Sequence, residues 1–273
     1  MSTDPIAFVG GGNMARSLIG GLIAGGMPAA SIRVAEPQAA LREALVDDFG
    51  IHTFERADDA VTGAATWLLA VKPQVMRTVC EALAPQAGAA RPLVVSIGAG
   101  ITTGQLQRWL GTQLPVVRAM PNTPALLGAG ITGLYANALA GEDGYRRAEA
   151  LLAGAGQTVR VDDEALIDAV TAVSGSGPAY AFLLAEAMEA AAREQGMPAD
   201  TARALVLQTL LGAARMLTET GEAPAELRRR VTSPGGTTQA AVETFEAGGF
   251  AALVADAIAA ATRRGRELSQ AND

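Results

Sequence analysis

The sequence predicts an α/β protein, with a mostly parallel β-sheet in its first part and helices alone in its second. Up to residue 161, short apolar and β-branched runs alternate with helical stretches, a pattern typical of parallel sheets. After Asp162 the strand signal disappears, and helices follow one another between Gly- and Pro-containing breaks. The chain of 273 residues is therefore expected to form two domains, residues 1–162 and 163–273.

Local apolar patterns predict the individual elements of the first domain. Compact apolar runs predict buried strands, and weaker runs complete the sheet; in chain order they are residues 6–9, 32–35, 67–71, 93–97, 116–117, 131–135 and 158–161. A helical pattern follows the first run over residues 13–24. A second helix is predicted through Leu41, Leu45 and Phe49.

One helix of the second domain is apolar on nearly every face. It carries Leu205, Val206, Leu207, Leu210, Leu211, Ala214, Met216 and Leu217. A surface helix has a single apolar stripe, so this helix requires burial on several sides. A partner subunit would provide that burial, and a central place in a self-contained bundle is the alternative.

Few reactive side chains are present, and this excludes several classes of active site. The chain has 1 His, 1 Cys and, among its 21 basic residues, a single lysine, Lys72. A Cys/His zinc site or a disulfide framework needs more of these residues, so no metal site is expected. If the protein is an enzyme, we expect a cofactor to carry the difficult chemical step.

Charge and hydropathy narrow the choice of partner and compartment. The net charge of −7 argues against nucleic acid and against an anionic membrane surface as partners. No apolar stretch reaches the roughly 18 residues of a membrane span. Residues 1–5 lack the basic segment of a secretory signal, and the chain has one thiol. A cytoplasmic location is therefore expected.

A glycine-rich motif follows the first predicted strand. Gly10, Gly12 and Ala15 have the G-x-G-x-x-A spacing between a strand and a helix, which is typical of a Rossmann-type dinucleotide-binding domain. The first glycine permits a tight turn, and the second lets the backbone approach a pyrophosphate. The helix N-terminus, with Asn13 and Met14, is expected to bind that anion. An ordinary glycine-rich turn is the alternative.

Two charged residues follow later strands. Glu36 is placed to accept hydrogen bonds from a ribose 2′-hydroxyl and would repel a 2′-phosphate, so its charge favours NADH over NADPH. Lys72, between Ala70 and Pro73, lies at the strand ends where ligands of open α/β sheets bind. A solvated glutamate and a surface lysine are the alternatives.

Four further loops are rich in Gly, Pro and small polar residues. They comprise residues 97–102, 118–124, 174–180 and 231–238. Turn and cap chemistry explains each loop alone, and Ser176 is expected to cap a helix with Pro178 in its first turn. The last loop also precedes a helix, and its N–H groups and hydroxyls suit a small carboxylate.

Taken together, these motifs resemble the pyrroline-5-carboxylate reductase family. The segments that carry the resemblance are residues 8–15, 70–73, 94–97, 118–124, 174–180 and 231–238. The last segment, with Leu227 before it and Val242, Phe245 and Glu246 after it, is similar to the family's own signature. The resemblance implies a Rossmann domain and an all-helical dimerisation domain, in a homodimer that assembles further. It also implies NADPH or NADH as cofactor and the reduction of 1-pyrroline-5-carboxylate to L-proline, the last step of proline biosynthesis.

The resemblance assigns roles to individual residues. The turn Gly235, Gly236, Thr237 and Thr238 would bind the substrate carboxylate, and Thr238 would be the catalytic group that orients the ring nitrogen. Asn122 and Ser176 would border the substrate and the nicotinamide. The cofactor would be bound by Gly10, Gly12, Asn13, Met14, Ala15, Glu36, Ala70, Lys72, Pro73 and Gly98. Glu36 departs from the small polar or basic residues common in members that prefer NADPH.

Two other functions remain open from the sequence. A Rossmann-type reductase of another small keto or imino acid usually needs a Lys or His near the carbonyl oxygen, and here only Lys72 could serve. A non-catalytic dinucleotide-binding sensor is the second alternative. A sensor has no need of a carboxylate-binding turn, so the presence of residues 231–238 argues against it. A protonated cyclic imine is already an electrophile, so its reduction by hydride fits the small number of acid and base side chains.

Overall fold

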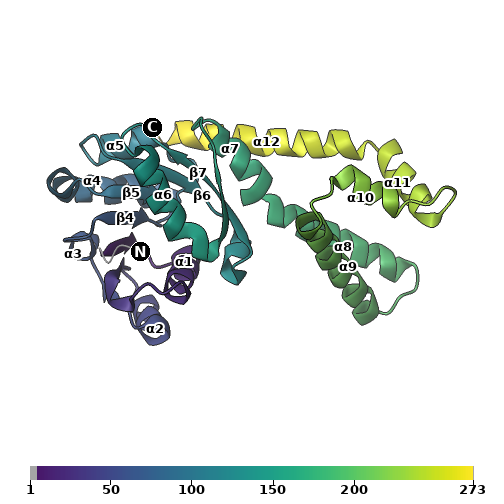
Figure 1. Cartoon of the computed structure of the whole chain (residues 1–273), viewed down its shortest axis with the longest axis horizontal. Coiled ribbons are helices and arrows are strands. Elements are labelled where there is room, and N and C mark those ends of the chain that lie inside the picture. The colour runs from purple at the N-terminus through teal and green to yellow at the C-terminus, as the bar shows by residue number, and fades with distance from the viewer. Residues whose placement is uncertain (1–4, 273) are drawn as a thin grey trace. The chain divides into compact units, whose positions relative to one another are not determined.

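The computed structural model describes residues 5–272. Met1–Asp4, part of the start from which we predicted no secretory signal, lie outside the described residues. An eight-stranded sheet has the order β3-β2-β1-β4-β5-β6-β7-β8 (Figure 1). The strands are β1 (Ile6–Val9), β2 (Ile32–Ala35), β3 (His52–Phe54), β4 (Thr66–Leu69), β5 (Leu93–Ser96), β6 (Val116–Met120), β7 (Gly130–Ala136) and β8 (Gly156–Arg160).

The predicted mostly parallel sheet is confirmed. Every neighbouring pair is parallel except β6 and β7, which are antiparallel. All the predicted strands are present, and β3 is an additional one that the sequence did not predict. β3 is a three-residue edge strand whose side chains are exposed or half-buried, so it lacks the apolar run on which the prediction relied.

Helices cover the two faces of the sheet and enclose two apolar clusters (Figure 1). These helices are α1 (Asn13–Ala24), α2 (Ala39–Phe49), α3 (Ala57–Val61), α4 (Pro73–Ala90), α5 (Thr103–Trp109) and α6 (Gly141–Leu152). One cluster contains Phe8 and Leu18, and the other contains Trp67 and Cys80. Burial raises the pKa of the Cys80 thiol to about 12, so the thiol stays protonated and belongs to the core.

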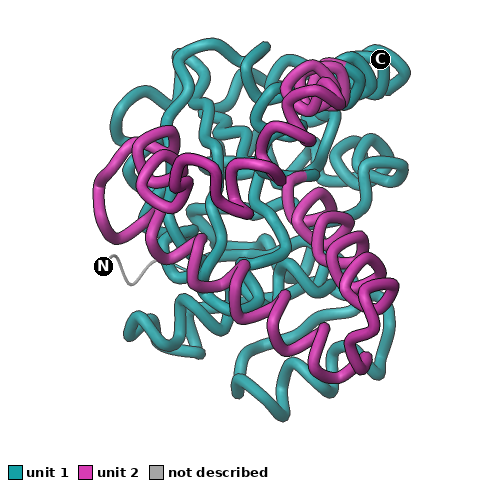
Figure 2. The backbone as a smooth tube through the Cα atoms, turned by 90° about the vertical axis from the view of Figure 1, so that its right-hand side faces the viewer, with its two compact units in different colours: residues 1–176, 260–273 teal, residues 177–259 magenta. Residues whose placement is uncertain are grey.

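The chain divides into two compact units (Figure 2). The first contains the chain up to Ser176 together with the residues from Ala260 on, and the second contains Gly177–Ala259. The remaining helices are α7 (Leu166–Val170), α8 (Gly177–Glu194), α9 (Ala199–Glu219), α10 (Pro224–Arg230), α11 (Thr237–Ala247) and α12 (Phe250–Ala271), and a π-helical turn, Thr171–Gly175, follows α7. The domain division after residue 162 remains a prediction. The compact units have other limits, because α7 packs on β6 and β7 and the end of α12 contacts Gly100 and Gln105 of the first unit.

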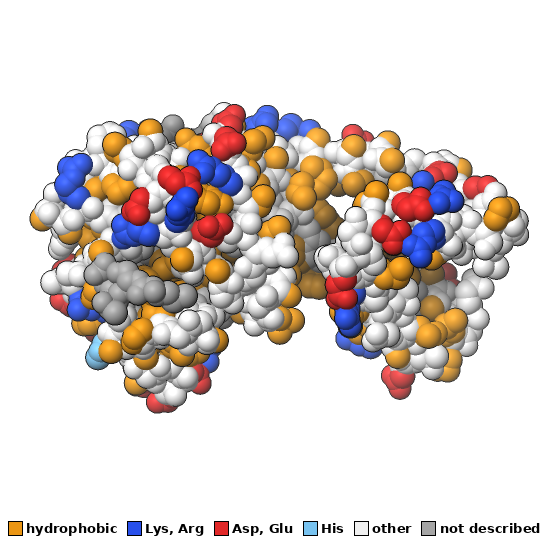
Figure 3. Space-filling model, viewed as in Figure 1, with side chains coloured by type: hydrophobic (Ala, Val, Ile, Leu, Met, Phe, Trp, Pro, Cys, Tyr) orange, Lys and Arg blue, Asp and Glu red, His pale blue; other side chains and the backbone are white. Residues whose placement is uncertain are grey.

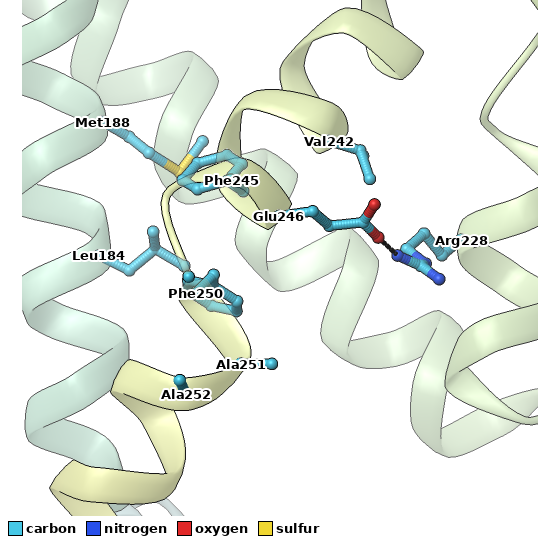
Figure 4. Close-up of a pocket in the computed structure, with 10 residues that line it drawn as sticks. Leu184, Met188, Arg228, Val242, Phe245, Glu246, Phe250, Ala251 and Ala252 are labelled. Carbon is cyan, nitrogen blue, oxygen red and sulfur yellow. Dashed lines mark hydrogen bonds and ion pairs between the residues drawn. The ribbon is translucent and has the colours of Figure 1, made fainter.

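The second unit exposes many large apolar side chains (Figure 3). Helix α9 leaves Leu205, Leu207, Leu211, Met216 and Leu217 between 44% and 55% exposed. A groove of about 720 Å³ is lined by α8, α10, α11 and the start of α12 (Figure 4). The rings of Phe245 and Phe250 meet edge to face there, with centroids 5.7 Å apart. Within the described chain, α9 therefore lacks the burial on several sides that its sequence requires.

No single helix among residues 5–272 is long and apolar enough to cross a membrane. Helices α11 and α12 have the length and apolar composition of a membrane span only when they are taken together, and they are bent by 51° relative to each other.

Candidate functional site at the carboxyl edge of the sheet

The candidate site of the first unit lies where the strand order reverses. β1 lies between β2 and β4, so the connections that leave β1 and β4 run to opposite sides. Ligands of open α/β sheets bind outside the carboxyl ends of the strands at such a point. Predicted site residues follow five parallel strands at this edge: Gly10, Gly12, Asn13, Met14 and Ala15 after β1, Glu36 after β2, Ala70, Lys72 and Pro73 after β4, Gly98 after β5, and Asn122 after β6.

The glycine-rich loop has the geometry that a bound pyrophosphate requires. Gly10 has φ +105°, and a Cβ there would lie 2.9 Å from the carbonyl of Ala70, so only glycine fits. A Cβ on Gly12 would meet nothing within 4 Å, so the space in front of α1 is open. No described side chain caps the N-terminus of α1, and its first turn has no acidic residue. These N–H groups suit the pyrophosphate of a dinucleotide.

Glu36 is buried, so the alternative of a solvated glutamate is wrong. Only 7% of the residue is exposed. Its Oε2 accepts from the N–H of Gly11 at 3.0 Å, and its Oε1 accepts from the N–H of Gln38 at 3.0 Å. Each carboxylate oxygen can accept a second hydrogen bond. Glu36 thus holds the glycine-rich loop and retains acceptor capacity for a ribose hydroxyl.

The arginines near the ends of β2 and β3 are occupied by contacts within the chain. Nη1 of Arg42 donates to the carbonyl oxygens of Glu36 and Pro37, both at 2.7 Å. Arg33 donates to a backbone carbonyl, and Arg56 forms an ion pair with a neighbouring aspartate. A 2′-phosphate placed beside Glu36 would therefore be repelled by the carboxylate, and the three neighbouring guanidinium groups already have partners within the chain.

Lys72 stands at the N-terminus of α4. It is exposed, and it forms no side-chain hydrogen bond or ion pair with any described residue. Pro73 is the first residue of α4, where its missing N–H costs nothing. Next along the edge, a Cβ on Gly98 would lie 2.8 Å from Cε of Met76, so the backbone there is closely packed. The Lys72 ammonium is thus available to a phosphate at this edge.

Asn122 and Ser176 both belong to the first unit, and Asn122 contacts Ser174, two residues before Ser176. Nδ2 of Asn122 donates to the carbonyl oxygen of Ser174 at 3.1 Å, and its Oδ1 accepts from the N–H of Ile131 at 3.0 Å. The N–H of Ser176 donates to the carbonyl oxygen of Thr171 at 2.8 Å. Both polar ends of the Asn122 amide are therefore already bonded within the chain, which the sequence did not predict.

The turn at residues 235–238 belongs to the second unit. Gly235 has φ +69°, and its N–H donates to Oε1 of Gln239 at 2.7 Å. The N–H of Gly236 donates to the carbonyl three residues before it at 3.0 Å. Thr237 and Thr238 begin α11, an 11-residue helix whose N-terminus no described side chain caps. The first-turn N–H groups and the Thr238 hydroxyl therefore remain for a carboxylate, rather than the two glycine N–H groups.

A buried charge cluster is centred on Arg118 in the middle of β6, and the sequence analysis did not single it out. The Arg118 side chain is 3% exposed, and its Nη2 lies 3.3 Å from Oδ1 of Asp168. Its Nη1 lies 3.6 Å from Oε1 of Glu164, whose carboxylate accepts from the N–H and hydroxyl of Thr103. Nε of Arg118 has no hydrogen-bond partner among the described residues. An arginine within a short apolar strand is the signal that would have indicated this cluster.

Comparisons with known proteins agree with this architecture. Residues 164–268 match the family model of pyrroline-5-carboxylate reductase dimerisation, and residues 5–100 match that of NADP oxidoreductase, coenzyme F420-dependent. A pyrroline-5-carboxylate reductase of Pseudomonas aeruginosa is 54% identical over 272 residues, 99% of this chain and 98% of the relative. The structure of the Coxiella burnetii reductase is 41% identical with a TM-score of 0.94, and it covers 98% of this chain and 99% of its own.

A more distant structure shows the fold alone. The Plasmodium falciparum pyrroline carboxylate reductase, solved with NADP bound, is 24% identical with a TM-score of 0.86 over 98% of this chain and 99% of its own. The predicted class, a Rossmann-type domain followed by a helical dimerisation domain, is confirmed. The matched dimerisation segment includes α9 and the apolar groove, and the protein is a homodimer. The chain belongs to the pyrroline-5-carboxylate reductase family of NAD(P)H-dependent oxidoreductases, which act on a C=N bond.

Proposed function

We propose that the protein reduces 1-pyrroline-5-carboxylate to L-proline with NADH or NADPH. The observation that carries the proposal is the 54% identity, across 99% of the chain, to a relative named for this activity. The cofactor supplies a hydride to the imine carbon, and the electron pair of the C=N bond moves to a nitrogen that is already protonated. The chain must therefore bind two anions and orient the imine, and it needs no strong side-chain acid.

The residues at the carboxyl edge of the sheet bind different parts of the cofactor. The first turn of α1 behind Gly12 binds the pyrophosphate, and Glu36 accepts from the adenosine ribose. Lys72 contributes a positive charge on the ribose and phosphate side of the cofactor. Ala70, Pro73 and Gly98 follow β4 and β5 at the same edge, where they contact the cofactor, and Ser176 borders the nicotinamide and substrate.

The substrate carboxylate is assigned to the start of α11. The free N–H groups of its first turn, Thr237 and Thr238, bind that anion. The Thr238 hydroxyl forms no hydrogen bond with another described residue, and it serves as a hydrogen-bond partner of the ring nitrogen. A neutral hydroxyl is a poor acid at neutral pH, so Thr238 orients the imine and does not protonate it.

Oxidation of NADH or NADPH in the presence of pyrroline-5-carboxylate tests the proposed function. We expect oxidation that depends on both the imine and the protein, with L-proline as the product. The absence of oxidation with either cofactor, for protein shown to be folded by circular dichroism, would contradict the proposal.

Thr238→Ala is expected to lower kcat/KM by more than tenfold, about 1.4 kcal/mol of transition-state binding. The variant removes the hydroxyl that orients the ring nitrogen and leaves α11 intact. Thr244→Ala is the matched control, because the Thr244 hydroxyl on the same helix donates to the Ala240 carbonyl at 2.9 Å. Steady-state kinetics of both variants give the comparison, and wild-type kinetics for Thr238→Ala would remove Thr238 from the mechanism.

We also propose that the homodimers assemble further. Large apolar side chains are exposed in the first unit as well, among them Leu126 at 55% and Leu127 at 87%. Such side chains favour burial at an additional interface. Light scattering at micromolar concentration is expected to give a mass above that of two 27.8 kDa chains. A dimer as the largest species would contradict further assembly.

A cytoplasmic location is the compartment we propose. The single thiol, Cys80, is buried and unpaired. A chain that uses no disulfide is compatible with a reducing compartment.

A further inference from the structure

The π-helical turn Thr171–Gly175 contains a carbonyl that the following helix cannot satisfy in the usual way. In an α-helix the carbonyl of Ser174 accepts from the N–H four residues later. That residue is Pro178, which has no N–H. Asn122 supplies a donor instead, since its Nδ2 donates to the Ser174 carbonyl at 3.1 Å. The loop after β6 therefore replaces a hydrogen bond that the helix lacks.

The other end of the same amide fixes a second segment. Oδ1 of Asn122 accepts from the N–H of Ile131, the second residue of β7, at 3.0 Å. One side chain thus joins the end of β6, the start of β7 and the π-helical turn. If the amide turned toward a ligand, the Ile131 N–H and the Ser174 carbonyl would both lose their partner.

The last residue of β6 packs against the same turn. A Cβ on Gly175 would lie 2.6 Å from Cε of Met120, so the turn and the strand end are in close contact. The N–H of Ser176 donates to the Thr171 carbonyl five residues earlier, at 2.8 Å, which is the π-helical pattern. Single π-helical turns within helices are frequent at functional sites. Ser176 is therefore bonded to a turn that both Met120 and Asn122 contact.

We propose that Asn122 is a positioning residue that holds the π-helical turn, and with it Ser176, in place for the reaction. The inference rests on the proposed function. It differs from the sequence-based expectation for Asn122, because the amide acts through Ser174 and does not bind the substrate. Its first variant is Asn122→Asp, which keeps the acceptor for the Ile131 N–H and removes the donor to Ser174.

Asn137 provides a matched control at the opposite end of β6. Its Oδ1 accepts from the N–H of Val116 at 3.1 Å, and its Nδ2 donates to the carbonyl of Leu114 at 3.0 Å. Asn137→Ala and Asn122→Ala therefore each remove an amide that bridges separate segments. Both are expected to lower the melting temperature. Only the Asn122 variants are expected to lower kcat, by at least tenfold, with the Kd for NADH within twofold of wild type.

Hydrogen exchange of the unliganded protein gives a readout that does not depend on turnover. We expect Asn122→Ala and Asn122→Asp to speed exchange of the Ser176 N–H at least tenfold, while Asn137→Ala leaves it unchanged. If exchange is unchanged in both Asn122 variants, the inference is overturned, whether or not the wild-type protein reduces pyrroline-5-carboxylate. A wild-type protein that fails to reduce the imine would refute only the proposed function. For an active wild type, a raised KM for the imine with unchanged kcat, or an equal loss of kcat in Asn137→Ala, also overturns it.

Discussion

Asp168→Ala is expected to destabilise the protein by about 3–5 kcal/mol, the usual cost of removing one partner from a buried ion pair. The variant leaves the Arg118 guanidinium, 3% exposed, with Glu164 at 3.6 Å as its remaining charged partner. Nε of Arg118 already lacks a hydrogen-bond partner among the described residues, so the cluster has no spare acceptor to compensate. Urea unfolding followed by circular dichroism measures the change in the free energy of unfolding.

Asp162→Ala is the control for Asp168→Ala. Asp162 also forms an ion pair with an arginine, Arg160, but its side chain is 90% exposed. Its removal is expected to cost at most about 1 kcal/mol, because exposed ion pairs contribute little. All samples need the same protomer concentration, since the stability of a dimer depends on it. Equal midpoints for the two variants would show that the Arg118 cluster does not stabilise the fold.

The parts of the fold that follow local patterns were predicted from the sequence. The helix predicted over residues 13–24 is α1, Asn13–Ala24, because its apolar spacing and the preceding glycine loop are both local signals. The strands with continuous apolar runs were predicted for the same reason. The sequence did not predict the three-residue strand β3 or the limits of the compact units, because both depend on packing between distant segments.

The candidate site likewise has features that local patterns predicted and contacts that they did not predict. Glycine spacing, Glu36 and Lys72 were recognisable because each follows a predicted strand, and parallel strands bring their carboxyl ends to one edge. The bonds of Asn122 to Ser174 and Ile131 span 52 and 9 residues, and no spacing rule connects them. The sequence likewise could not indicate that the Gly235 and Gly236 N–H groups are already occupied. Such contacts become visible only when the chain is folded.

Glu36→Gln is expected to shift the ratio of kcat/KM for NADPH over NADH by at least tenfold toward NADPH, about 1.4 kcal/mol. The buried carboxylate faces the glycine loop through the Gly11 N–H, where the adenosine ribose of a dinucleotide is expected. A 2′-phosphate beside this carboxylate is repelled by about 4 kcal/mol per pair of unit charges at 4 Å and an effective dielectric constant of 20. Glutamine removes the charge and keeps an acceptor for the Gly11 N–H.

Two companion variants separate the charge of Glu36 from its structural role. Glu36→Ser removes both the charge and the loop contacts, so it should shift the ratio in the same direction and weaken the binding of both cofactors. Glu43→Gln is the matched control, because it removes an exposed charge from α2 without facing Gly11. Fluorescence titration with each cofactor gives the Kd values without the imine. An unchanged ratio in Glu36→Gln would mean that Glu36 only holds the loop.

Arg42 provides a counter-test of the expected preference for NADH. Its guanidinium is the nearest cation in sequence after Glu36, and in a phosphate-binding role it would be the group that selects NADPH. Because Nη1 is held by the Glu36 and Pro37 carbonyls at 2.7 Å, we expect Arg42→Ala to leave the NADPH/NADH ratio of Kd values within twofold of wild type. A selective loss of NADPH affinity in Arg42→Ala would show that the guanidinium leaves those carbonyls for the 2′-phosphate. The carboxylate of Glu36 would then be balanced by Arg42, and the chain would accept both cofactors.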